Sequence, residues 1–479
     1  MNIRVSVIVP VYNPGSYLQP LLQSLDRQTL PAEEFEAIFV DDGSSDGTAD
    51  VLDEWARERP HIVIVHQPNH GWPGQPRNVG IDRARGTYVY FVDQDDWIGD
   101  EALARLVAYA DENGSDVVVG KMKGIGREVP KSLFTASVPR AVIGQTPLQD
   151  SQTPHKMFRT GFLNEIGLRF PEGQRRLEDH LFVTTAYLRA GVVSVYSDYD
   201  CYMHILRSDR KNAAYRPFEP AGYYANLDEV LDVIDRYLPV GDVKDRFVQR
   251  WIKNELVRRL RIRSVRDMPR ARRNAFFAEV SRILRERISE SAIRLLPPDH
   301  RVGAILARHA TAADFFRIDR AIDDVDLVAS PASAGSGLAL RLYDGLHMMP
   351  VDARLSHLLA RHASPGLARA VLGDLRDDPL LLPATAALTD AAGTEHRPTG
   401  EAGTGAYAQD AAVHLGDRVR LLTPFGCRTA TVTIAGTARL RADLAVRGTR
   451  RRVHRLAVRA ALAMFGPTAV DRIGVALRH

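Results

Sequence analysis

Cysteine is almost absent from this sequence, since Cys201 and Cys427 are the only two in 479 residues. Two cysteines so far apart exclude a disulfide-rich scaffold and fit a reducing compartment such as the cytosol. No run of about eighteen apolar residues occurs, and the N-terminus leads into a strand-like stretch without a signal-peptide pattern. We therefore expect a cytoplasmic protein, with any contact to the inner face of the cell membrane being peripheral.

Two phosphate-binding motifs are missing as well. A dinucleotide-binding fold has Gly-x-Gly-x-x-Gly after its first strand, but here that turn reads Val11-Tyr12-Asn13-Pro14-Gly15. The phosphate loop of nucleoside triphosphatases does not occur either. The formal net charge of +4 is too small for this length to indicate a nucleic-acid partner. These absences argue against a nicotinamide-dependent oxidoreductase, a P-loop enzyme and a nucleic-acid-binding protein.

Short apolar runs alternate with helical patterns over roughly the first 120 residues. Strand-like runs occur at residues 5–9, 35–40, 62–65 and 88–92, with helical periodicity between them, as in residues 17–25. This order predicts an α/β domain with a mostly parallel sheet and helices on both faces. Ligands of such sheets bind beyond the carboxyl ends of the strands.

The composition changes along the chain, and its length is enough for two or three domains. We assign residues 1–215 to the α/β domain and 216–323, where apolar residues recur at helix spacing, to a helical linker region. Alternating stretches rich in Gly, Ala, Ser and Thr predict a β-sandwich-like module at 324–445. Arginines among apolar residues predict a basic amphipathic helix at 446–479.

Acidic residues follow two of the predicted strands. Asp41 and Asp42 stand after one strand, and Asp93, Asp95 and Asp96 stand after another. Carboxylates spaced Asp-x-Asp can hold a hard cation such as Mg²⁺ or Mn²⁺ together with diphosphate oxygens. Either cluster alone is equally compatible with capping of the following helix. Only other segments of the sequence can therefore distinguish a cation site from helix capping.

Four short segments occur one after another along the chain, each at the end of a predicted strand or in the loop that follows it. They are Pro10-Val11-Tyr12-Asn13, Asp41-Asp42-Gly43-Ser44, Arg77-Asn78-Val79-Gly80 and Asp93-Gln94-Asp95-Asp96. Together they resemble the family-two inverting glycosyltransferases, which have the GT-A fold. The resemblance covers roughly residues 3–215.

The resemblance implies a binding site for a UDP-sugar. Pro10 and Tyr12 would line the uracil pocket, and Asp42 would accept a hydrogen bond from the base N3–H. Asn69 and Arg77, in the loop after the third strand, would contact the nucleotide or its sugar. For Arg77 a plain helix start is the competing interpretation.

The same resemblance implies a metal site in the acidic loop. Asp93 would face the ribose and sugar hydroxyls, and Asp95 would be the principal ligand of Mn²⁺ or Mg²⁺. Asp96 would support the metal ligand or cap the next helix, and we favour the cap. His204 would be a further metal ligand, as in some family members, or an ordinary packed histidine.

Glu178 and Asp179 resemble the Glu-Asp pair of the family, which implies that Glu178 contacts substrate and Asp179 is the general base. Inverting transfer needs such a carboxylate, because the attacking hydroxyl must lose its proton as the new bond forms. Without the resemblance the pair would be an ordinary surface acidic pair. Arg207 and Ser208 match a basic stretch that covers the diphosphate, a role for which the planar guanidinium is suited.

The layout of the whole chain narrows the comparison. A catalytic domain, a helical linker and β-modules resemble the poly(ribitol phosphate) N-acetylglucosaminyltransferases that decorate bacterial wall teichoic acid. The loop at residues 69–80 looks like theirs. The resemblance implies a UDP-N-acetylglucosamine donor, an anionic glycopolymer acceptor and a homo-oligomer, a trimer, assembled through the β-modules. The basic tail would bind an anionic polymer or membrane leaflet, or be a solvated helix.

Two other functions stay open. The enzyme could use UDP-glucose or UDP-galactose on a capsule or exopolysaccharide acceptor. Alternatively, the chain could be an assembly or binding protein with an inactive transferase domain, although Asp42, Asp93, Asp95 and Asp179 argue against that.

Overall fold

The computed structural model describes residues 3–207, 218–261, 265, 267–323, 327–334, 337–344, 349–350, 359, 363–374, 388–389, 395–396, 418–423, 426–434 and 440–444. Its contacts divide the chain into two units, Met1–Arg250 and Trp251–His479. Within the described ranges, no helix combines the length and the apolar character needed to cross a membrane.

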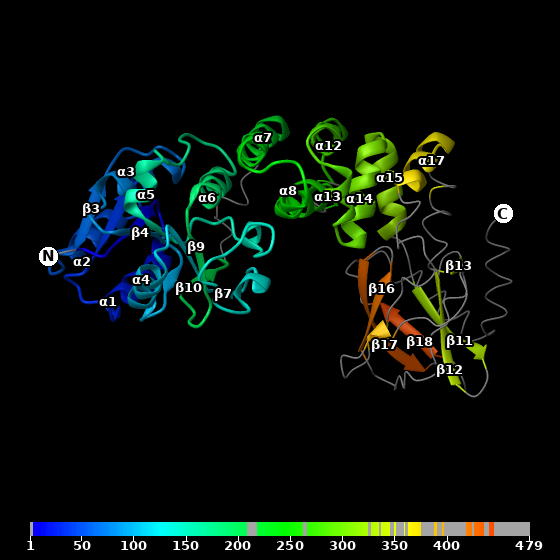
Figure 1. Ribbon diagram of the computed structural model, residues 1–479, viewed down its shortest axis with the longest axis horizontal. Coiled ribbons are helices and arrows are strands. Elements are labelled where there is room, and N and C mark those ends of the chain that lie inside the picture. The colour runs from blue at the N-terminus through cyan, green and yellow to red at the C-terminus, as the bar shows by residue number, and fades with distance from the viewer. Residues whose placement is uncertain are drawn as a thin grey trace. The chain divides into compact units, whose positions relative to one another are not determined.

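The first unit is built around a seven-stranded sheet, shown in blue to green in Figure 1. Its strands, in spatial order, are β3 (Ile62–His66), β2 (Phe35–Asp41), β1 (Val5–Val11), β4 (Tyr88–Phe91), β8 (Met157–Arg159), β6 (Val117–Gly120) and β9 (Val193–Tyr196). All neighbours pair in parallel except β8, which runs antiparallel to both β4 and β6. The prediction of a mostly parallel sheet is therefore confirmed.

Helices cover both faces of this sheet. They are α1 (Leu18–Asp26), α2 (Thr48–Ala56), α3 (Gly74–Arg83), α4 (Ala102–Asn113), α5 (Thr160–Glu165) and α6 (Glu178–Arg189), with short 3₁₀ turns at Gly15–Tyr17, Lys131–Phe134 and Leu148–Asp150. Side chains alternate along β1, so Val7 packs with α1, α2 and α4 while Ile8 packs with α3, α5 and α6. Each face of the sheet thus has its own cluster of buried hydrophobic side chains, and the two clusters hold the carboxyl ends of the strands in place.

A small second sheet lies beside the acidic loop. It orders β5 (Trp97–Ile98), β10 (Tyr202–Ile205) and β7 (Met122–Ile125), with β10 antiparallel to β5 and parallel to β7. Because β5 follows the acidic loop directly, this pairing brings β10 against that loop. The sequence pattern at residues 154–215 looks irregular, yet the structure has α5, α6 and three short strands there.

The region after the α/β domain is helical, as the apolar spacing predicts. It contains α7 (Pro220–Tyr237), α8 (Asp242–Phe247), α9 (Gln249–Trp251), a π-helix (Ile252–Val257), α10 (Arg258–Arg261), α12 (Arg270–Glu286), α13 (Glu290–Arg294), α14 (Pro298–His309) and α15 (Ala312–Asp323). In α7 the residues at helical spacing, Leu227, Val230, Leu231 and Ile234, are buried.

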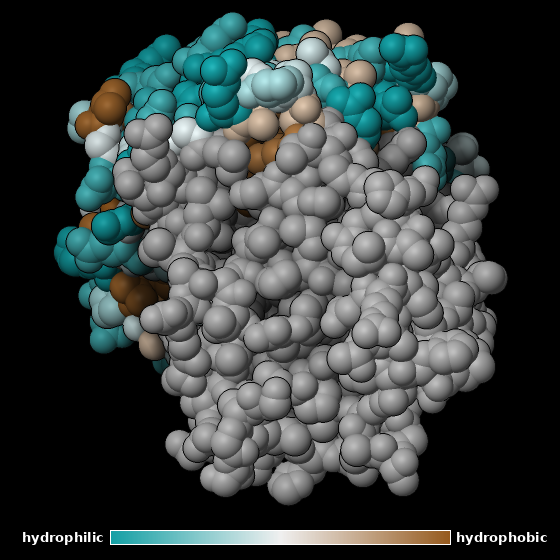
Figure 2. All heavy atoms as spheres, turned by 90° about the vertical axis from the view of Figure 1, so that its right-hand side faces the viewer, coloured by the Kyte–Doolittle hydropathy of each residue, from teal (hydrophilic) through white to brown (hydrophobic). Residues whose placement is uncertain are grey.

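The described strands of the second unit all pair antiparallel. One sheet has β11 (Leu327–Ala334), β12 (Gly337–Asp344) and β13 (Met349–Pro350), and the other has β15 (Glu395–His396), β14 (Leu388–Thr389), β16 (Arg418–Thr423), β17 (Gly426–Ile434) and β18 (Leu440–Leu444). Helix α17 (Pro365–Asp374) interrupts this β-rich region and was not predicted. The described surface seen in Figure 2 is mostly hydrophilic. The predicted basic helix at 446–479 lies outside the described residues.

Candidate active site

A pocket of about 350 Å³ opens at the carboxyl ends of β1, β2 and β4. Its lining includes most of the predicted site residues, namely Pro10, Tyr12, Asp42, Arg77, Asp93, Asp95 and Arg207. Asn69, Glu178 and Asp179 are not part of this lining, and Ser208 lies outside the described residues. Trp72 and Gln94 also line the pocket and were not predicted as site residues.

Arg77 links the pocket to the Glu178-Asp179 segment. Its buried guanidinium donates from Nη2 to Asp93 Oδ1 at 2.9 Å, and Nη1 lies 3.8 Å from Glu178 Oε1. Two of its nitrogens, Nε and Nη1, have no hydrogen-bond partner among the described residues. Arg77 stands inside α3, one turn after its start, and its side chain lines the pocket, while its contact with the nucleotide stays a prediction.

Helix α3 approaches the chain ahead of Glu178 very closely. The side chain of Asn78 donates to Phe170 O at 2.9 Å and accepts from Phe170 N at 2.8 Å. Gly74 is required for this approach, because a Cβ there would lie 2.5 Å from the carbonyl oxygen of Pro171. The Arg77-Asn78 motif thus contributes one side chain to the pocket and another that anchors the chain leading to Glu178.

Asp93 is held between two basic side chains. In addition to Arg77, His155 places Nε2 at 3.0 Å from Asp93 Oδ2, and Asp93 N donates to Tyr202 Oη at 3.1 Å. Burial alone would raise the pKa of Asp93, but His155 and Arg77 outweigh it and hold that pKa well below its usual range. Asp93 is therefore an ionised, fixed acceptor. His155 was missed by sequence reasoning, since a single histidine in an irregular segment carries no pattern.

Asp95 has a different environment from Asp93. Its Oδ2 lies 3.8 Å from Nη1 of Arg207, whose guanidinium covers the ring of Tyr17 at 4.4 Å. Burial and the charge of Asp93 raise the pKa of Asp95 to about 6. A nearby divalent cation would relieve this repulsion, so the arrangement suits a metal ligand.

Asp96 is not a helix cap, contrary to the favoured sequence interpretation. Helix α4 begins at Ala102, and the Asp96 carboxylate accepts hydrogen bonds from Tyr202 Oη at 2.6 Å and Ile205 N at 2.8 Å. The correction has a physical reason: β10 pairs beside the loop and satisfies this carboxylate from a strand that is distant in sequence.

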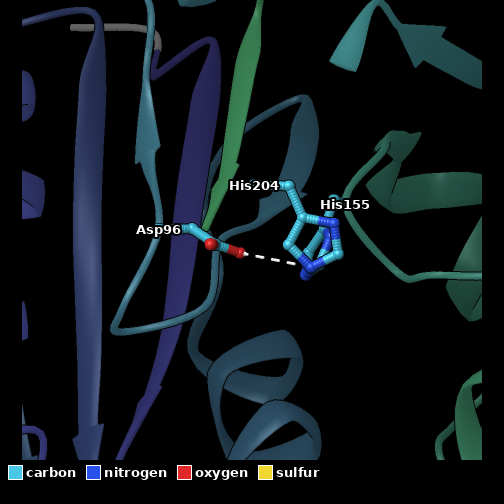
Figure 3. Close-up of side chains that lie close together, drawn as sticks. All are labelled: Asp96, His155 and His204. Carbon is cyan, nitrogen blue, oxygen red and sulfur yellow. Dashed lines mark ion pairs between the residues drawn. The ribbon is translucent and has the colours of Figure 1, made fainter. Parts of the chain in front are cut away.

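Two groups of side chains have the donor atoms that a cation needs. In the first group, Asp93, Asp95 and Asp96 each place one carboxylate oxygen within 4.8 Å of the other two. In the second group, a carboxylate oxygen of Asp96 and one ring nitrogen each of His155 and His204 lie within the same distance of one another (Figure 3). His204 Nε2 lies 3.9 Å from Asp96 Oδ2. Burial lowers the pKa of His204 to about 2, which keeps the ring neutral, as a metal-binding histidine must be. The all-oxygen group fits Mg²⁺ or Mn²⁺.

The opposite wall of the pocket is held by two polar side chains. The Gln94 amide accepts from Tyr12 N at 2.7 Å and donates to Tyr12 O at 3.1 Å, while the Tyr12 side chain is 41% exposed. The buried Asp42 carboxylate accepts from the backbone N–H groups of His70 and Gly71 at 3.0 and 3.2 Å. Asp42 therefore orders the loop that places Trp72 at the pocket.

Glu178 and Asp179 begin α6, directly after a strained turn. Leu177 has a left-handed backbone with φ of +63°, although it is a bulky residue. Burial raises the pKa of Asp179, and His180 opposes this effect. A carboxylate with a raised pKa is a stronger base.

Lys156 is a further buried ionisable group and was not predicted. Its ammonium donates to the carbonyl of Thr153 and lies 5.8 Å from the centre of the Tyr187 ring. Burial lowers the pKa of Lys156 to about 7, and the charge of Asp179 acts in the opposite direction. A positive charge near Asp179 helps to keep that carboxylate ionised.

Known proteins that are similar to this chain are glycosyltransferases. Residues 6–184 match the family described as Glycosyl transferase family 2, and residues 220–319 match the Glycosyl transferase TarS linker domain. Poly(ribitol-phosphate) beta-glucosyltransferase of Bacillus spizizenii is 38% identical over 234 residues, which are 48% of this chain and 37% of that protein. Poly(ribitol-phosphate) beta-N-acetylglucosaminyltransferase TarS of Staphylococcus aureus is 37% identical over 222 residues, 46% of this chain and 39% of that one.

Solved structures of TarS also resemble this chain. The crystal structure of S. aureus TarS 1–349 in complex with UDP-GlcNAc has a TM-score of 0.60 and 27% identity, covering 71% of this chain and 97% of that one. A second S. aureus TarS structure covers 94% of this chain with a TM-score of 0.60 and 19% identity, which is a likeness of fold alone. The chain matches less than two fifths of the length of the two curated relatives.

Proposed function

Because residues 6–184 form a glycosyltransferase family 2 domain and residues 220–319 match a TarS linker, we propose that this protein transfers a sugar from a UDP-sugar to a hydroxyl of a poly(ribitol phosphate) chain, the backbone of a wall teichoic acid. One observation carries the proposal. Tyr12, Arg77, Asp93, Asp95 and Arg207 line one pocket at the carboxyl end of a mostly parallel sheet. This pocket offers an aromatic ring for a base, guanidinium groups for phosphates and carboxylates for a cation.

The proposed donor is UDP-N-acetylglucosamine, with UDP-glucose as the second candidate. A beta-N-acetylglucosaminyltransferase and a beta-glucosyltransferase match this chain at almost the same identity. Turnover should be measured with purified protein, poly(ribitol phosphate) and a panel of UDP-sugars, each with and without Mn²⁺. Turnover with one donor identifies the sugar, whereas a lack of turnover with every donor would favour a binding protein with an inactive transferase domain.

The chain's own residues carry the steps of the proposed transfer. Asp179 accepts the proton of the attacking hydroxyl, and its raised pKa makes it an effective base. Arg77 and His155 hold Asp93 ionised and immobile, so that it can accept hydrogen bonds from donor hydroxyls. Arg207 faces the pocket above Tyr17 and would neutralise phosphate charge. Attack from the side of the pocket opposite the leaving diphosphate inverts the anomeric carbon.

A divalent cation, held by Asp95 with Asp93 and Asp96 nearby, would supply electrostatic stabilisation for the leaving diphosphate. Asp95 is the principal ligand in this proposal, because a cation would relieve the repulsion from Asp93 that helps to raise its pKa. Assembly through the β-rich module, cytoplasmic location and the role of the basic tail stay predictions.

Asp95→Ala should remove the metal dependence of UDP binding, because it deletes the principal proposed ligand. Isothermal titration of UDP with and without Mn²⁺ measures this directly. In the unmodified protein, protons compete with the cation for a carboxylate whose pKa is about 6. Mn²⁺ affinity should therefore fall about tenfold between pH 7 and pH 5. Asp100→Ala, an exposed carboxylate after the same loop, serves as control. Metal-dependent UDP affinity that persists in Asp95→Ala would rule out this ligand role.

Gln94→Leu should weaken UDP binding about 5- to 150-fold, because it removes the two hydrogen bonds that hold the backbone of Tyr12. The replacement keeps a similar volume, so the effect comes from lost positioning of the base-binding wall. Gln23→Leu, at an exposed position of α1, is the matched control. An unchanged dissociation constant for UDP would mean that the uracil ring does not bind at Tyr12.

A further inference from the structure

The pocket at the carboxyl ends of β1, β2 and β4, proposed to bind the UDP-sugar, is called the donor pocket below. A second pocket of the first unit, of about 410 Å³, lies next to it and shares Trp72 with it. Two stretches form most of its wall: the chain just before Glu178 and the start of α7. We call it the arginine pocket. Its main lining residues are Trp72, Gln174, Arg175, Arg176, Tyr223 and Asn226. Apart from Trp72, which also lines the donor pocket, none of these residues has a role in the transfer described above.

Aromatic rings position the guanidinium of Arg176. Its Cζ lies 5.6 Å from the ring centre of Trp72 and 5.4 Å from that of Phe218. Arginine favours such contacts because its planar, weakly hydrated cation stacks on aromatic faces. The guanidinium of Arg176 therefore lies close to two aromatic rings at this pocket.

The neighbouring arginine is held by an acidic side chain. Arg175 donates from Nη2 to Glu229 Oε2 at 2.7 Å, and its buried Nε has no hydrogen-bond partner among the described residues. Glu219 also lines the pocket, so the charges around it are mixed. Gln174 and Asn226 add uncharged amide donors. The pocket therefore suits a singly charged, hydroxyl-bearing ligand better than a highly charged one such as a diphosphate.

Position along the chain connects this pocket to the proposed chemistry. Arg176 stands three residues before Asp179, and three residues of chain span at most about 11 Å. A polymer whose hydroxyl lies at Asp179 must continue past the base in some direction. The arginine pocket lies within this short reach, and Trp72 separates it from the donor pocket.

We propose that the arginine pocket binds a phosphodiester group of the acceptor polymer, next to the polyol unit whose hydroxyl Asp179 deprotonates. Arg176 would bind the two free phosphate oxygens through its planar edge, and the amides would bind polyol hydroxyls. The proposal rests on the proposed function, because it takes the acceptor to be a polyol phosphate. It adds the part of the acceptor that the enzyme recognises besides the reacting hydroxyl.

Arg176→Gln should raise the KM for poly(ribitol phosphate) about 10- to 100-fold, because one charge-assisted contact is lost. The kcat, the dissociation constant for UDP, the rate of UDP-sugar hydrolysis and the KM for free ribitol, which has no phosphate, should change little. The KM for the polymer should also depend less steeply on ionic strength than in the unmodified protein. Arg176→Lys should recover part of the loss. Arg57→Gln, at an exposed arginine directly after α2, is the matched control.

Gly222 supplies a second variant that does not weaken the fold. It lines the arginine pocket within α7, and a Cβ at this position meets no atom within 4 Å. Both Gly222→Ala and Gly222→Glu favour the helix, but only the glutamate adds a negative charge to the pocket. Gly222→Glu should therefore raise the KM for the polymer, while Gly222→Ala should not.

These experiments distinguish a failure of the acceptor-site proposal from a failure of the proposed sugar transfer itself. If Arg176→Gln and Gly222→Glu both leave the KM for the polymer unchanged while sugar transfer continues, the arginine pocket is not an acceptor site. If the variants raise the KM for free ribitol as much as that for the polymer, the pocket does not recognise phosphate and the proposal is wrong. Absence of transfer in the unmodified protein would instead refute the proposed function.

Discussion

Asp179→Asn should lower the rate of sugar transfer about 100- to 10,000-fold, the usual contribution of a positioned general base. The asparagine keeps the shape of the side chain but cannot accept a proton. Because Asp179 does not line the donor pocket, the dissociation constant for UDP should change little. Steady-state kinetics with a saturating UDP-sugar, together with titration calorimetry of UDP, measure both quantities. Near-normal turnover in this variant would exclude Asp179 as the base.

The pH dependence supplies an independent check on the same residue. Burial raises the pKa of Asp179 above its ordinary value of about 3.9. The proposed base accepts a proton only when it is ionised, so transfer by the unmodified protein should decline as the pH falls through this raised pKa. The residual activity of Asp179→Asn should lack that decline. Asp50→Asn, at an exposed position of α2, should retain both the rate and the pH profile.

Arg77→Met should destabilise the first unit by about 3–5 kcal/mol, the cost of removing one partner from a buried ion pair. The variant leaves the carboxylates of Asp93 and Glu178 without the cation between them. Urea unfolding followed by Trp fluorescence measures the loss. Arg83→Met, at an exposed position of the same helix, should stay within about 0.5 kcal/mol of the unmodified protein.

The sign of the pH effect on this variant follows from Asp93. In the folded protein His155 and Arg77 depress the pKa of Asp93, so its ionised form adds stability above its unfolded pKa of about 3.9. That contribution disappears as the pH falls toward the depressed pKa. The difference between Arg77→Met and the unmodified protein should thus be largest near pH 7 and shrink under acid conditions. A constant difference across this range would mean that Arg77 acts mainly through packing.

Local sequence patterns were sufficient for the parts of the site that lie at strand ends. Pro10, Asp42, Asp93 and Asp95 directly follow apolar runs, and parallel strands bring their carboxyl ends to one edge. The same patterns predicted the helix faces, since burial in α7 follows the 3.6-residue period. These features depend on residues that are close together in the chain.

The rest of the site depends on contacts between distant segments, which no local pattern encodes. His155 meets Asp93 across 62 residues because the antiparallel β8, directly after it, is inserted beside β4. The sequence favours a helix cap for Asp96, because an aspartate that precedes a helix often caps it. Its true partners, on β10, are more than 100 residues away. Short strands of this kind have too few residues to show a period.

The left-handed backbone of Leu177 has a wider consequence. Such a conformation costs a bulky residue about 1–3 kcal/mol and persists only where surrounding structure imposes it. Leu177 is buried, and the nearby chain is anchored by Phe170, which stacks on Phe182 of α6 with ring centres 3.8 Å apart. The position of the proposed base therefore depends on the hydrophobic packing around α6. The proposed sugar transfer would therefore report damage to this core before global unfolding does.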